Sequence, residues 1–439
     1  MDAFHQSIPV LGLPRSFADA FDLTRQLNVR YIWIDALCII QDDKLDWETE
    51  AATMHNVYIG SFLTIQASEA VSASEGCFVQ INPAFAEAQP CGRALFTALE
   101  PNGNNEILVH IVPHTARIAA LNQRGWTLQE TVLSHRTIQL TDHELHWRCR
   151  SDIVWETGIV YENSERLHGN VPPLQQSHDH RLYETWWTWM ENYSERRFSF
   201  PGDRLPGIAG LVEFYQRETN DVSCLGLWRR SMQRDLAWLR IGTSDERPLD
   251  PPLSQPLPSW SPFACRQAIQ FNFWNDHGSE RKTAHCTTEV LDCAIEWSGT
   301  PFISDLRSSK LVLRGPTREI YLAEATEIKG CNPPYFNINS EVVDSNELLL
   351  PWRCAVQWDK EGFREPSNWL CLLLQRQTPS GFEFGGETFL VLEALENVAS
   401  ESMWRRIGIG SLGRQRSQKG PGELTWVFEL GECQTVTLV

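Results

Sequence analysis

The strongest pattern along the chain is an alternation of amphipathic segments with short apolar runs between residues 13 and 67. In residues 13–28 the apolar side chains recur at i, i+3 and i+4, with Pro14 at an early helical position, and this spacing predicts a helix. Residues 31–35 are apolar until Asp35 ends the run, which is typical of a strand buried on both faces of a parallel sheet. An unpaired buried aspartate is costly, so we expect Asp35 to be paired, at the strand end, or used in function.

The same alternation continues through residue 67. Asp46 is expected to cap a helix over 47–58, and residues 61–67 are expected to form the next strand. The helix would bury a stripe of side chains made of Trp47, Ala51, Met54 and Tyr58. The order helix, strand, helix, strand predicts an α/β layer built on a parallel sheet.

The remainder of the chain divides into two regions of different character. The first is expected to contain a strand at 106–112, a helix at 124–133, a hairpin at 136–140 and 144–149, a polar connection at 157–180, and helices at 181–198, 204–218 and 224–236. The second is dominated by short β-like runs between glycine turns, at 310–314, 319–325, 369–375, 388–392, 406–409 and 424–430. We therefore predict an α/β domain at 1–150, a helical connecting region at 151–255 and a mostly β domain at 256–439.

Composition limits the classes of partner. The net charge of −18 argues against binding to nucleic acid and to anionic membranes. No apolar run approaches the roughly 18 residues that a membrane-spanning helix needs. The 12 cysteines include no CxxC pair and no zinc-like spacing, so we expect a reduced, cytoplasmic protein without a metal site. We assign no cofactor, because GxSxG, GxGxxG, Walker and HExxH motifs are absent.

Three blocks of sequence together resemble one protein family. They are residues 31–42 (YIWIDALCIIQD), 124–130 (RGWTLQE) and 203–211 (DRLPGIAGL). On these blocks the chain is similar to fungal heterokaryon incompatibility (HET) proteins, with the HET domain over roughly residues 1–150. HET domains usually open with a strand that carries a Cys-Trp-Gly type motif. None precedes residue 13, so we expect this HET domain to be short at its N-terminus.

The resemblance implies a role in allorecognition and programmed cell death when genetically different fungal cells fuse. Its implied partners are other incompatibility proteins or a second copy of the chain. It also implies a TIR-like, flavodoxin-like parallel sheet. Some TIR relatives cleave NAD at the nicotinamide–ribose bond, so a nucleotide-cleaving site follows by fold analogy alone. The missing opening strand weakens this last expectation.

Three acids are candidate catalytic residues. Asp35 would project at the carboxyl edge of the sheet, where open α/β sheets bind ligands, or would cap the following turn or pair with an arginine such as Arg124. Glu130 is a candidate general acid/base or ribose-binding carboxylate, although Thr127 and Glu130 also have the spacing of a capping box. Glu50 borders the apolar stripe of its helix, and either faces a cleft or lies in solvent.

Three further residues are candidate ligand-binding residues: Arg124, Trp126 and Trp33. Arg124 can pair with a ligand anion, and the two tryptophans can stack on a ring, although aromatic residues in such motifs more often belong to the core. Cys38 lies in an apolar stretch without a local histidine, so we expect it to be buried and inert.

Two functions remain open from the sequence. The first is a HET-type effector or regulator that acts through protein partners, with or without nucleotide cleavage. The second is a HET-like protein recruited to fungal secondary metabolism as a tailoring enzyme or binding protein. In that case the 18 tryptophans would help to line an apolar pocket for a small-molecule ligand.

Overall fold

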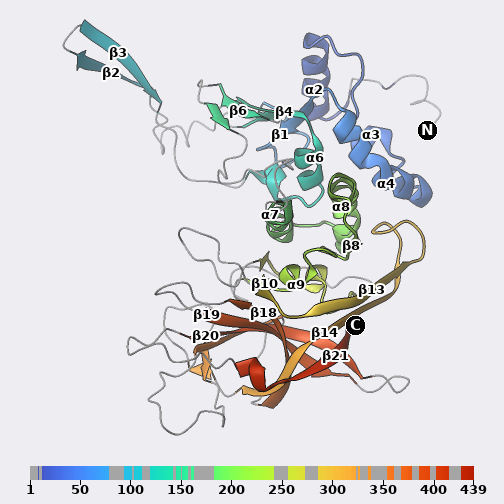
Figure 1. The fold of residues 1–439 in the computed structure, drawn as a ribbon. Coiled ribbons are helices and arrows are strands. Elements are labelled where there is room, and N and C mark those ends of the chain that lie inside the picture. Colours follow the sequence, from blue (N-terminus) through green and yellow to red (C-terminus); the bar gives the residue numbers. More distant parts are fainter. Residues whose placement is uncertain are drawn as a thin grey trace. The chain divides into compact units, whose positions relative to one another are not determined.

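The computed structural model describes residues 8, 12–78, 93–100, 103–110, 119–141, 145–149, 151–156, 160–162, 182–241, 256–271, 285–322, 325–326, 335–337, 353–359, 367–377, 385–395, 402–414 and 427–439. The chain forms two compact units, Met1–Gln175 and Gln176–Val439, each with its own helices and strands (Figure 1). The polar connection predicted at 157–180 lies almost entirely outside the described residues.

The helices of the first unit are α2 (Arg15–Gln26), α3 (Asp35–Cys38), α4 (Lys44–Gly60), η1 (Ala120–Gln123) and α6 (Thr127–Leu133). Helix α2 confirms the helix predicted at 13–28. It follows Pro14, whose φ of −52° is compatible with a helix start. It ends before Asn28, whose φ of 56° lies in the left-handed region that stops a helix.

Helix α4 confirms the helix predicted at 47–58 but begins earlier, because Asp43 caps it. The Asp43 carboxylate accepts hydrogen bonds from the backbone N–H groups of Leu45 (2.9 Å) and Asp46 (3.2 Å). Asp46, the predicted cap, accepts instead from the N–H of Ile40 at 2.8 Å. The prediction of Asp46 as the cap was therefore wrong, and Asp46 fixes the turn between α3 and α4.

The sheet of the first unit is mixed rather than parallel. Its strands are β1 (Thr64–Ala67), β4 (Arg136–Leu140), β5 (Leu145–Cys149), β6 (Asp152–Trp155) and β7 (Val160–Glu162), in spatial order β1-β4-β5-β6-β7. Among the described strands of this sheet, β1 and β4 alone pair in parallel, and the other neighbours are antiparallel. Short connections join consecutive strands from β4 onward, and such connections produce antiparallel neighbours. The predicted hairpin is confirmed, whereas the all-parallel sheet is not observed.

A separate hairpin of the first unit consists of β2 (Arg93–Glu100) and β3 (Gly103–His110). It pairs with no other described strand, since the two form a sheet of their own. Strand β3 includes most of the strand predicted at 106–112.

The strand predicted at 31–35 is not formed. Residues 31–34 have no regular secondary structure and pair with no described strand, and Asp35 begins the short helix α3. Tyr31 is 79% exposed, whereas Ile32 packs against the core of the unit. An apolar run identifies a segment that contacts a core, but it does not provide the neighbouring strand that a ladder needs. The placement of Asp35 at the edge of a sheet was therefore wrong.

The helices of the second unit are α7 (Leu182–Ser194), η2 (Pro201–Arg204), α8 (Pro206–Thr219), α9 (Met232–Asp235), η3 (Pro262–Ala264) and η4 (Val427–Leu430). Helices α7 and α8 confirm two predictions. The helix predicted at 224–236 is replaced by α9 and a hairpin of β8 (Ser223–Cys224) and β9 (Leu227–Trp228). Leu225 and Gly226 both have positive φ, 49° and 93°, as a two-residue hairpin turn requires.

Ten strands form the large sheet of the second unit within the described residues. They are β12 (His285–Cys286), β13 (Glu289–Trp297), β14 (Leu306–Leu322), β15 (Ala325–Thr326), β16 (Tyr335–Asn337), β17 (Arg353–Trp358), β18 (Ser367–Gln377), β19 (Gly385–Ala394), β20 (Met403–Arg414) and β21 (Glu432–Leu438). A small additional sheet pairs β10 (Leu239–Arg240) with β11 (Ile269–Gln270).

The large sheet confirms that the C-terminal region is mostly β. Its core contains Val356, Leu373, Phe389, Val391 and Ile407, each at most 3% exposed. The strand predicted at 424–430 was wrong, because the described part of this segment, Val427–Leu430, is a 3-10 helix and the strand follows it as β21.

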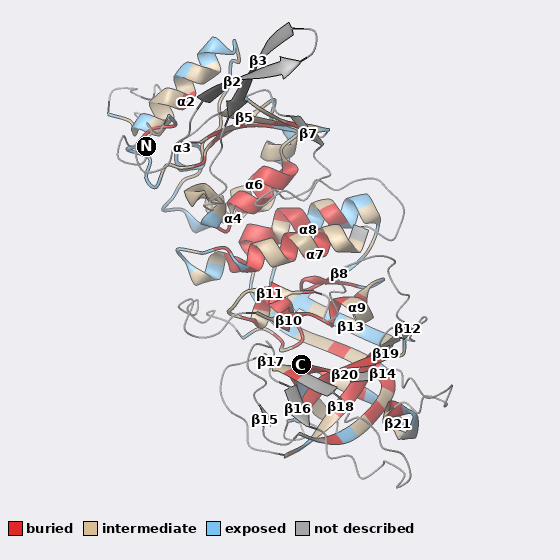
Figure 2. Ribbon diagram, turned by 90° about the vertical axis from the view of Figure 1, so that its left-hand side faces the viewer, coloured by how far each residue is buried: buried red, intermediate tan, exposed pale blue. Residues whose placement is uncertain are grey.

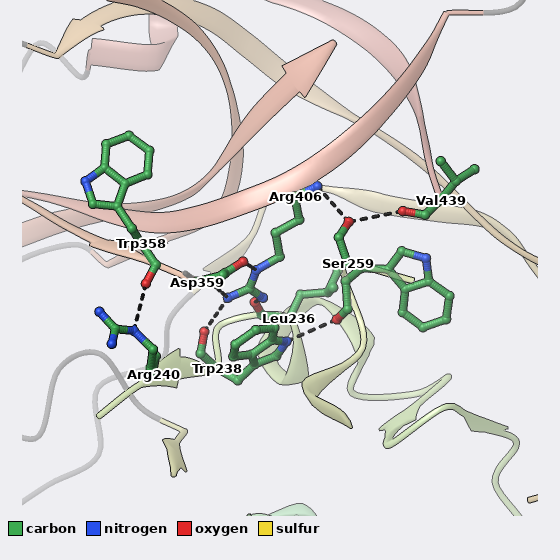
Figure 3. Close-up of polar contacts among 9 residues, drawn as sticks. Leu236, Trp238, Arg240, Ser259, Trp358, Asp359, Arg406 and Val439 are labelled. Atoms are coloured by element: carbon green, nitrogen blue, oxygen red, sulfur yellow. Dashed lines mark hydrogen bonds and ion pairs between the residues drawn. The ribbon is translucent and has the colours of Figure 1, made fainter. Parts of the chain in front are cut away.

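A buried arginine joins the sheet of the second unit to its helical part (Figure 3). Arg406, on β20, contacts both carboxylate oxygens of Asp359, with Nε 2.9 Å from Oδ2 and Nη2 3.2 Å from Oδ1. It also donates to the backbone carbonyls of Leu236 (2.7 Å) and Trp238 (2.6 Å). Its Cζ lies 3.5 Å from the centroid of the Trp238 ring. The buried charge is thus paired and hydrogen-bonded, as a charge in an apolar core must be.

Candidate functional site

The side chains of Tyr58 and Glu130 meet between α4 and α6 of the first unit. They share a hydrogen bond, in which the phenol of Tyr58 donates to the carboxylate of Glu130. The pKa of Tyr58 is raised well above its usual value, first by burial, and then by the charges of Glu130 and Asp35. The charge of Arg124 acts in the opposite direction. Three predicted site residues are therefore close enough to Tyr58 to affect its ionisation.

We call the group of Asp35, Tyr58, Arg124 and Glu130 the Tyr58 cluster. Its members come from four places in the chain: the start of α3, the last turns of α4, the segment after η1, and α6. The fold, rather than local sequence, therefore assembles two carboxylates, a guanidinium and a phenol. In such a set the arginine can pair with an anion, and the carboxylates can accept hydrogen bonds from the hydroxyl groups of a ligand.

Tyr58 is the member of this cluster that the sequence did not indicate as functional. Its position on the apolar stripe of α4 predicted only packing. The hydroxyl group of Tyr58 could have indicated a polar contact, because a buried tyrosine usually places its O–H against an acceptor. In the structure Glu130, on α6, is that acceptor.

Glu130 is available to Tyr58 because α6 does not begin with a capping box. The N-cap residue is Trp126, and no side chain caps this end of the helix. The Thr127 hydroxyl donates backward, to the carbonyls of Leu121 and Arg124, both at 2.8 Å. The capping-box interpretation of Thr127 and Glu130 was therefore wrong.

Hydrogen bonds fix α6 to the sheet on the side that carries Thr131 and Ser134. The amide of Gln66, on β1, donates to the Thr131 hydroxyl at 2.8 Å, and the Thr64 and Ser134 hydroxyl oxygens lie 2.6 Å apart. Most of α6 is buried, as Figure 2 shows. Since Gln66 is 2% and Thr131 is 5% exposed, these contacts exclude water and hold the helix in one position. The Glu130 carboxylate is thereby placed by a rigid support.

Two aromatic pairs flank the cluster. The Trp33 and Tyr58 rings are 5.9 Å apart at 76°, and the Trp47 and Trp126 rings are 6.2 Å apart at 86°. Both are edge-to-face arrangements, which are favourable for aromatic packing. Trp33 and Trp126 therefore pack against residues of α4, and their predicted contact with a ligand stays a prediction.

Glu50 is not brought into the Tyr58 cluster. It lies eight residues before Tyr58 on α4, about 12 Å along the helix axis. No hydrogen bond or ion pair to its carboxylate occurs among the described residues.

Cys38, predicted to be buried, is exposed at the end of α3.

Two other classes of site find no support among the described residues. No group of three or more His, Cys, Asp and Glu side chains is arranged to hold a metal ion there. No described helix combines the length and the apolar character that crossing a bilayer requires.

Residues 2–130 match the family model of the heterokaryon incompatibility protein (HET). The match spans less than a third of the chain and contains the whole Tyr58 cluster. No curated protein and no solved structure matches the chain. The known similarity of this chain thus coincides with the residues that form the candidate site.

Proposed function

From the premise that residues 2–130 are a HET domain, we propose that the protein acts in heterokaryon incompatibility, as an effector or regulator of allorecognition and cell death between fungal cells. The observation that carries the proposal is the Tyr58 cluster, which lies inside the matched residues. A cluster assembled from four separate segments at the core of the matched region is the natural candidate for the acting site of the domain.

The proposed partners are other incompatibility proteins or a second copy of the chain. Large apolar side chains that are exposed on the HET domain support this part of the proposal. Tyr31, Leu45, Phe62 and Val71 are 79%, 72%, 61% and 81% exposed, respectively. Exposed apolar groups of this kind are typical of surfaces that bind proteins when they are contiguous.

The finer proposal is that the Tyr58 cluster binds the ribose and phosphate groups of a nucleotide. Arg124 would pair with the phosphate, while Asp35 and Glu130 would accept hydrogen bonds from the ribose hydroxyl groups. In a nucleotide-cleaving reaction, a carboxylate beside the ribose would stabilise the positive charge that develops as the glycosidic bond breaks. The mixed sheet lends no support to a TIR-like fold, so the chemistry of the cluster alone supports this step.

The alternative function in secondary metabolism lacks a comparable observation. It rested on tryptophans that would line an apolar pocket. Five of them fill the interior of the second unit, each at most 1% exposed: Trp186, Trp189, Trp228, Trp238 and Trp260. Trp186 packs edge-to-face against Trp228, with ring centroids 5.1 Å apart. These tryptophans stabilise a core and leave that alternative without its main argument.

The test is conditional expression of the full chain in a fungal host, with growth and cellular NAD followed over time. Growth arrest with a fall in NAD supports both the incompatibility role and nucleotide cleavage. Growth arrest at constant NAD supports action through protein partners and contradicts cleavage of NAD. Normal growth at a confirmed level of folded protein contradicts the proposed function.

A further inference from the structure

Strand β13 (Glu289–Trp297) has an unpaired outer edge, on the side that faces away from β14. Its inner edge pairs with β14, and it joins no other described strand. Outside this ladder, no described residue forms a hydrogen bond with a peptide group of residues 289–297. Unpaired N–H and C=O groups at the edge of a sheet are a template for a further strand. The outer edge of β13 therefore offers donors and acceptors to an extended chain.

Side chains of β13 leave the strand accessible along its whole length. No residue of the strand is buried, and the exposed ones are Glu289, Leu291, Asp292, Ala294 and Glu296. Proteins commonly protect a sheet edge with proline, lysine, a bulge or a very short strand. This edge has nine residues without proline or lysine, and its protection consists of a bulge at Leu291 and acidic side chains. The acids therefore determine which strand the edge can accept.

The two faces of β13 differ in character beyond this bulge. Side chains alternate between the faces of a strand, so Asp292, Ala294 and Glu296 share one face. All three are exposed. Cys293 and Ile295 point to the opposite face and are only partly exposed. One face of the strand is thus acidic and in solvent, whereas the other is apolar and half-buried.

The acidic face is not neutralised by the strand on its inner side. Neither Asp292 nor Glu296 lies opposite a basic residue of β14. Glu296 accepts a hydrogen bond from the Ser308 hydroxyl at 2.9 Å, and neither carboxylate forms an ion pair with a residue that the structure describes. Lys310, the cation of this stretch of β14, lies opposite Ala294. Two carboxylates therefore outnumber it, and positive charge on the outer side would be favourable.

We propose that the outer edge of β13 binds an extended segment of a partner protein as an added strand, and that this segment alternates basic with apolar side chains. Its backbone would pair with the unpaired groups of β13, as in other cases of strand addition. Its basic side chains would lie opposite Asp292 and Glu296, at the cross-strand distance of about 5 Å. Its apolar side chains would extend the half-buried face of Cys293 and Ile295. This surface belongs to the second unit, so it does not depend on the function of the HET domain.

A second copy of the chain fits this edge poorly. An antiparallel pair of β13 strands centred on Ala294 would place Asp292 of each copy directly opposite Glu296 of the other. Like charges directly opposite each other destabilise a sheet. The net charge of −18 adds a general repulsion between copies. Both terms favour a basic partner over self-association.

The experiment uses the full chain and a short synthetic peptide of alternating lysine and valine with blocked ends. Binding is measured by titration calorimetry, and its place on the chain by hydrogen–deuterium exchange. The expected result is saturable binding that slows exchange at the backbone N–H groups of residues 289–297. A peptide of the same composition, in which all lysines precede all valines, should bind about tenfold more weakly, because it cannot place its cations on one face of a strand.

Substitutions test the two carboxylates. Asp292→Asn and Glu296→Gln together should weaken binding of the alternating peptide about tenfold, since two cross-strand charge pairs are lost. Both side chains are exposed, so the fold should tolerate the changes. The matched control is Glu319→Gln, an exposed acid on the part of β14 that pairs with β18, and it should bind like the parent.

Four results would overturn the proposal. They are no binding of the alternating peptide, equal binding of the two peptides, binding without protection of residues 289–297, and unchanged binding to the double variant. Sedimentation of the chain as a dimer with β13 protected would also overturn it, because the edge would then be occupied by a second copy.

Discussion

Tyr58 donates a hydrogen bond to Glu130, and this contact connects helix α4 to helix α6 within the residues that match the HET family model. The relationship explains why the RGWTLQE motif ends in a glutamate that does not cap its own helix. It also explains why a helix whose remaining stripe is apolar carries a tyrosine near its end. The same contact places the two residues beside Asp35 and Arg124, which gives the domain its charged cluster.

The first prediction concerns this contact. Tyr58→Phe retains the ring against Trp33 and removes only the hydroxyl, which leaves the Glu130 carboxylate without one of its donors. We expect a loss of about 1–3 kcal/mol in the free energy of unfolding, measured by urea denaturation of the full chain. The matched control is Tyr31→Phe, because Tyr31 is 79% exposed and should change stability little. Equal effects of the two substitutions would contradict the assigned hydrogen bond.

The second prediction concerns Arg406. Arg406→Met removes the ion pair with Asp359 and the hydrogen bonds to the Leu236 and Trp238 carbonyls, so we expect a loss of about 3–5 kcal/mol in urea denaturation. Arg406→Lys should lose less, because a single ammonium retains the charge but cannot make all these contacts. The neighbouring Arg405 provides the control.

Arg405 Nη1 lies 3.7 Å from Glu393 Oε2, and the two side chains are 47% and 33% exposed, respectively. Arg405→Met should therefore cost less than about 1 kcal/mol. Comparable losses for the Arg405 and Arg406 substitutions would show that the buried network does not stabilise the second unit as described.

The third prediction concerns pH. Asp235 is fully buried and accepts hydrogen bonds from Trp187 Nε1, Trp228 N and Ser231 Oγ, each at 2.8 Å. Burial raises its pKa from 3.8 to about 7, although the three hydrogen bonds oppose this shift and the charge of Asp221 adds to it. The pKa of Asp235 is therefore higher in the folded state than in the unfolded state. Its contribution to the free energy of unfolding is present in full below pH 3.8 and is lost as the pH rises through 7.

Asp235→Asn removes the titrating group and should flatten this dependence. Relative to the variant, the parent should lose up to about 4 kcal/mol of unfolding free energy between pH 4 and pH 7. The measurement is denaturant unfolding of both proteins at a series of pH values. Parallel stability curves would contradict a raised pKa at Asp235.

Local patterning predicted those elements whose periodicity is strong and whose ends carry clear signals. Helices α2, α7 and α8 and the β4–β5 hairpin belong to this class. The pattern failed where an outcome depended on a distant partner or on backbone freedom. Residues 31–34 have the composition of a strand but pair with no described neighbour, and the turn at Leu225 and Gly226 lies within a helical pattern. The division into three domains stays a prediction.

In the candidate site too, the residue that was missed is the one whose role depends on a distant partner. Asp35, Arg124 and Glu130 were identified by residue type within their motifs, and the fold brings all three to Tyr58. Tyr58 was missed because a tyrosine on an apolar stripe predicts packing, and its acceptor lies 72 positions further along the chain. Glu50 was proposed from its place beside the stripe, which does not determine how far along α4 the site lies.

The proposed function depends most on Glu130 as the acting carboxylate of the Tyr58 cluster. The most direct measurement is the growth of a fungal host on conditional expression of the parent chain, Glu130→Gln and Glu50→Gln at equal levels of folded protein. Glutamine preserves the shape of the side chain and removes its charge, and Glu50 is a matched carboxylate outside the cluster. The account predicts growth arrest with the parent and with Glu50→Gln, and normal growth with Glu130→Gln. Growth arrest by Glu130→Gln to the same extent as by the parent would contradict it.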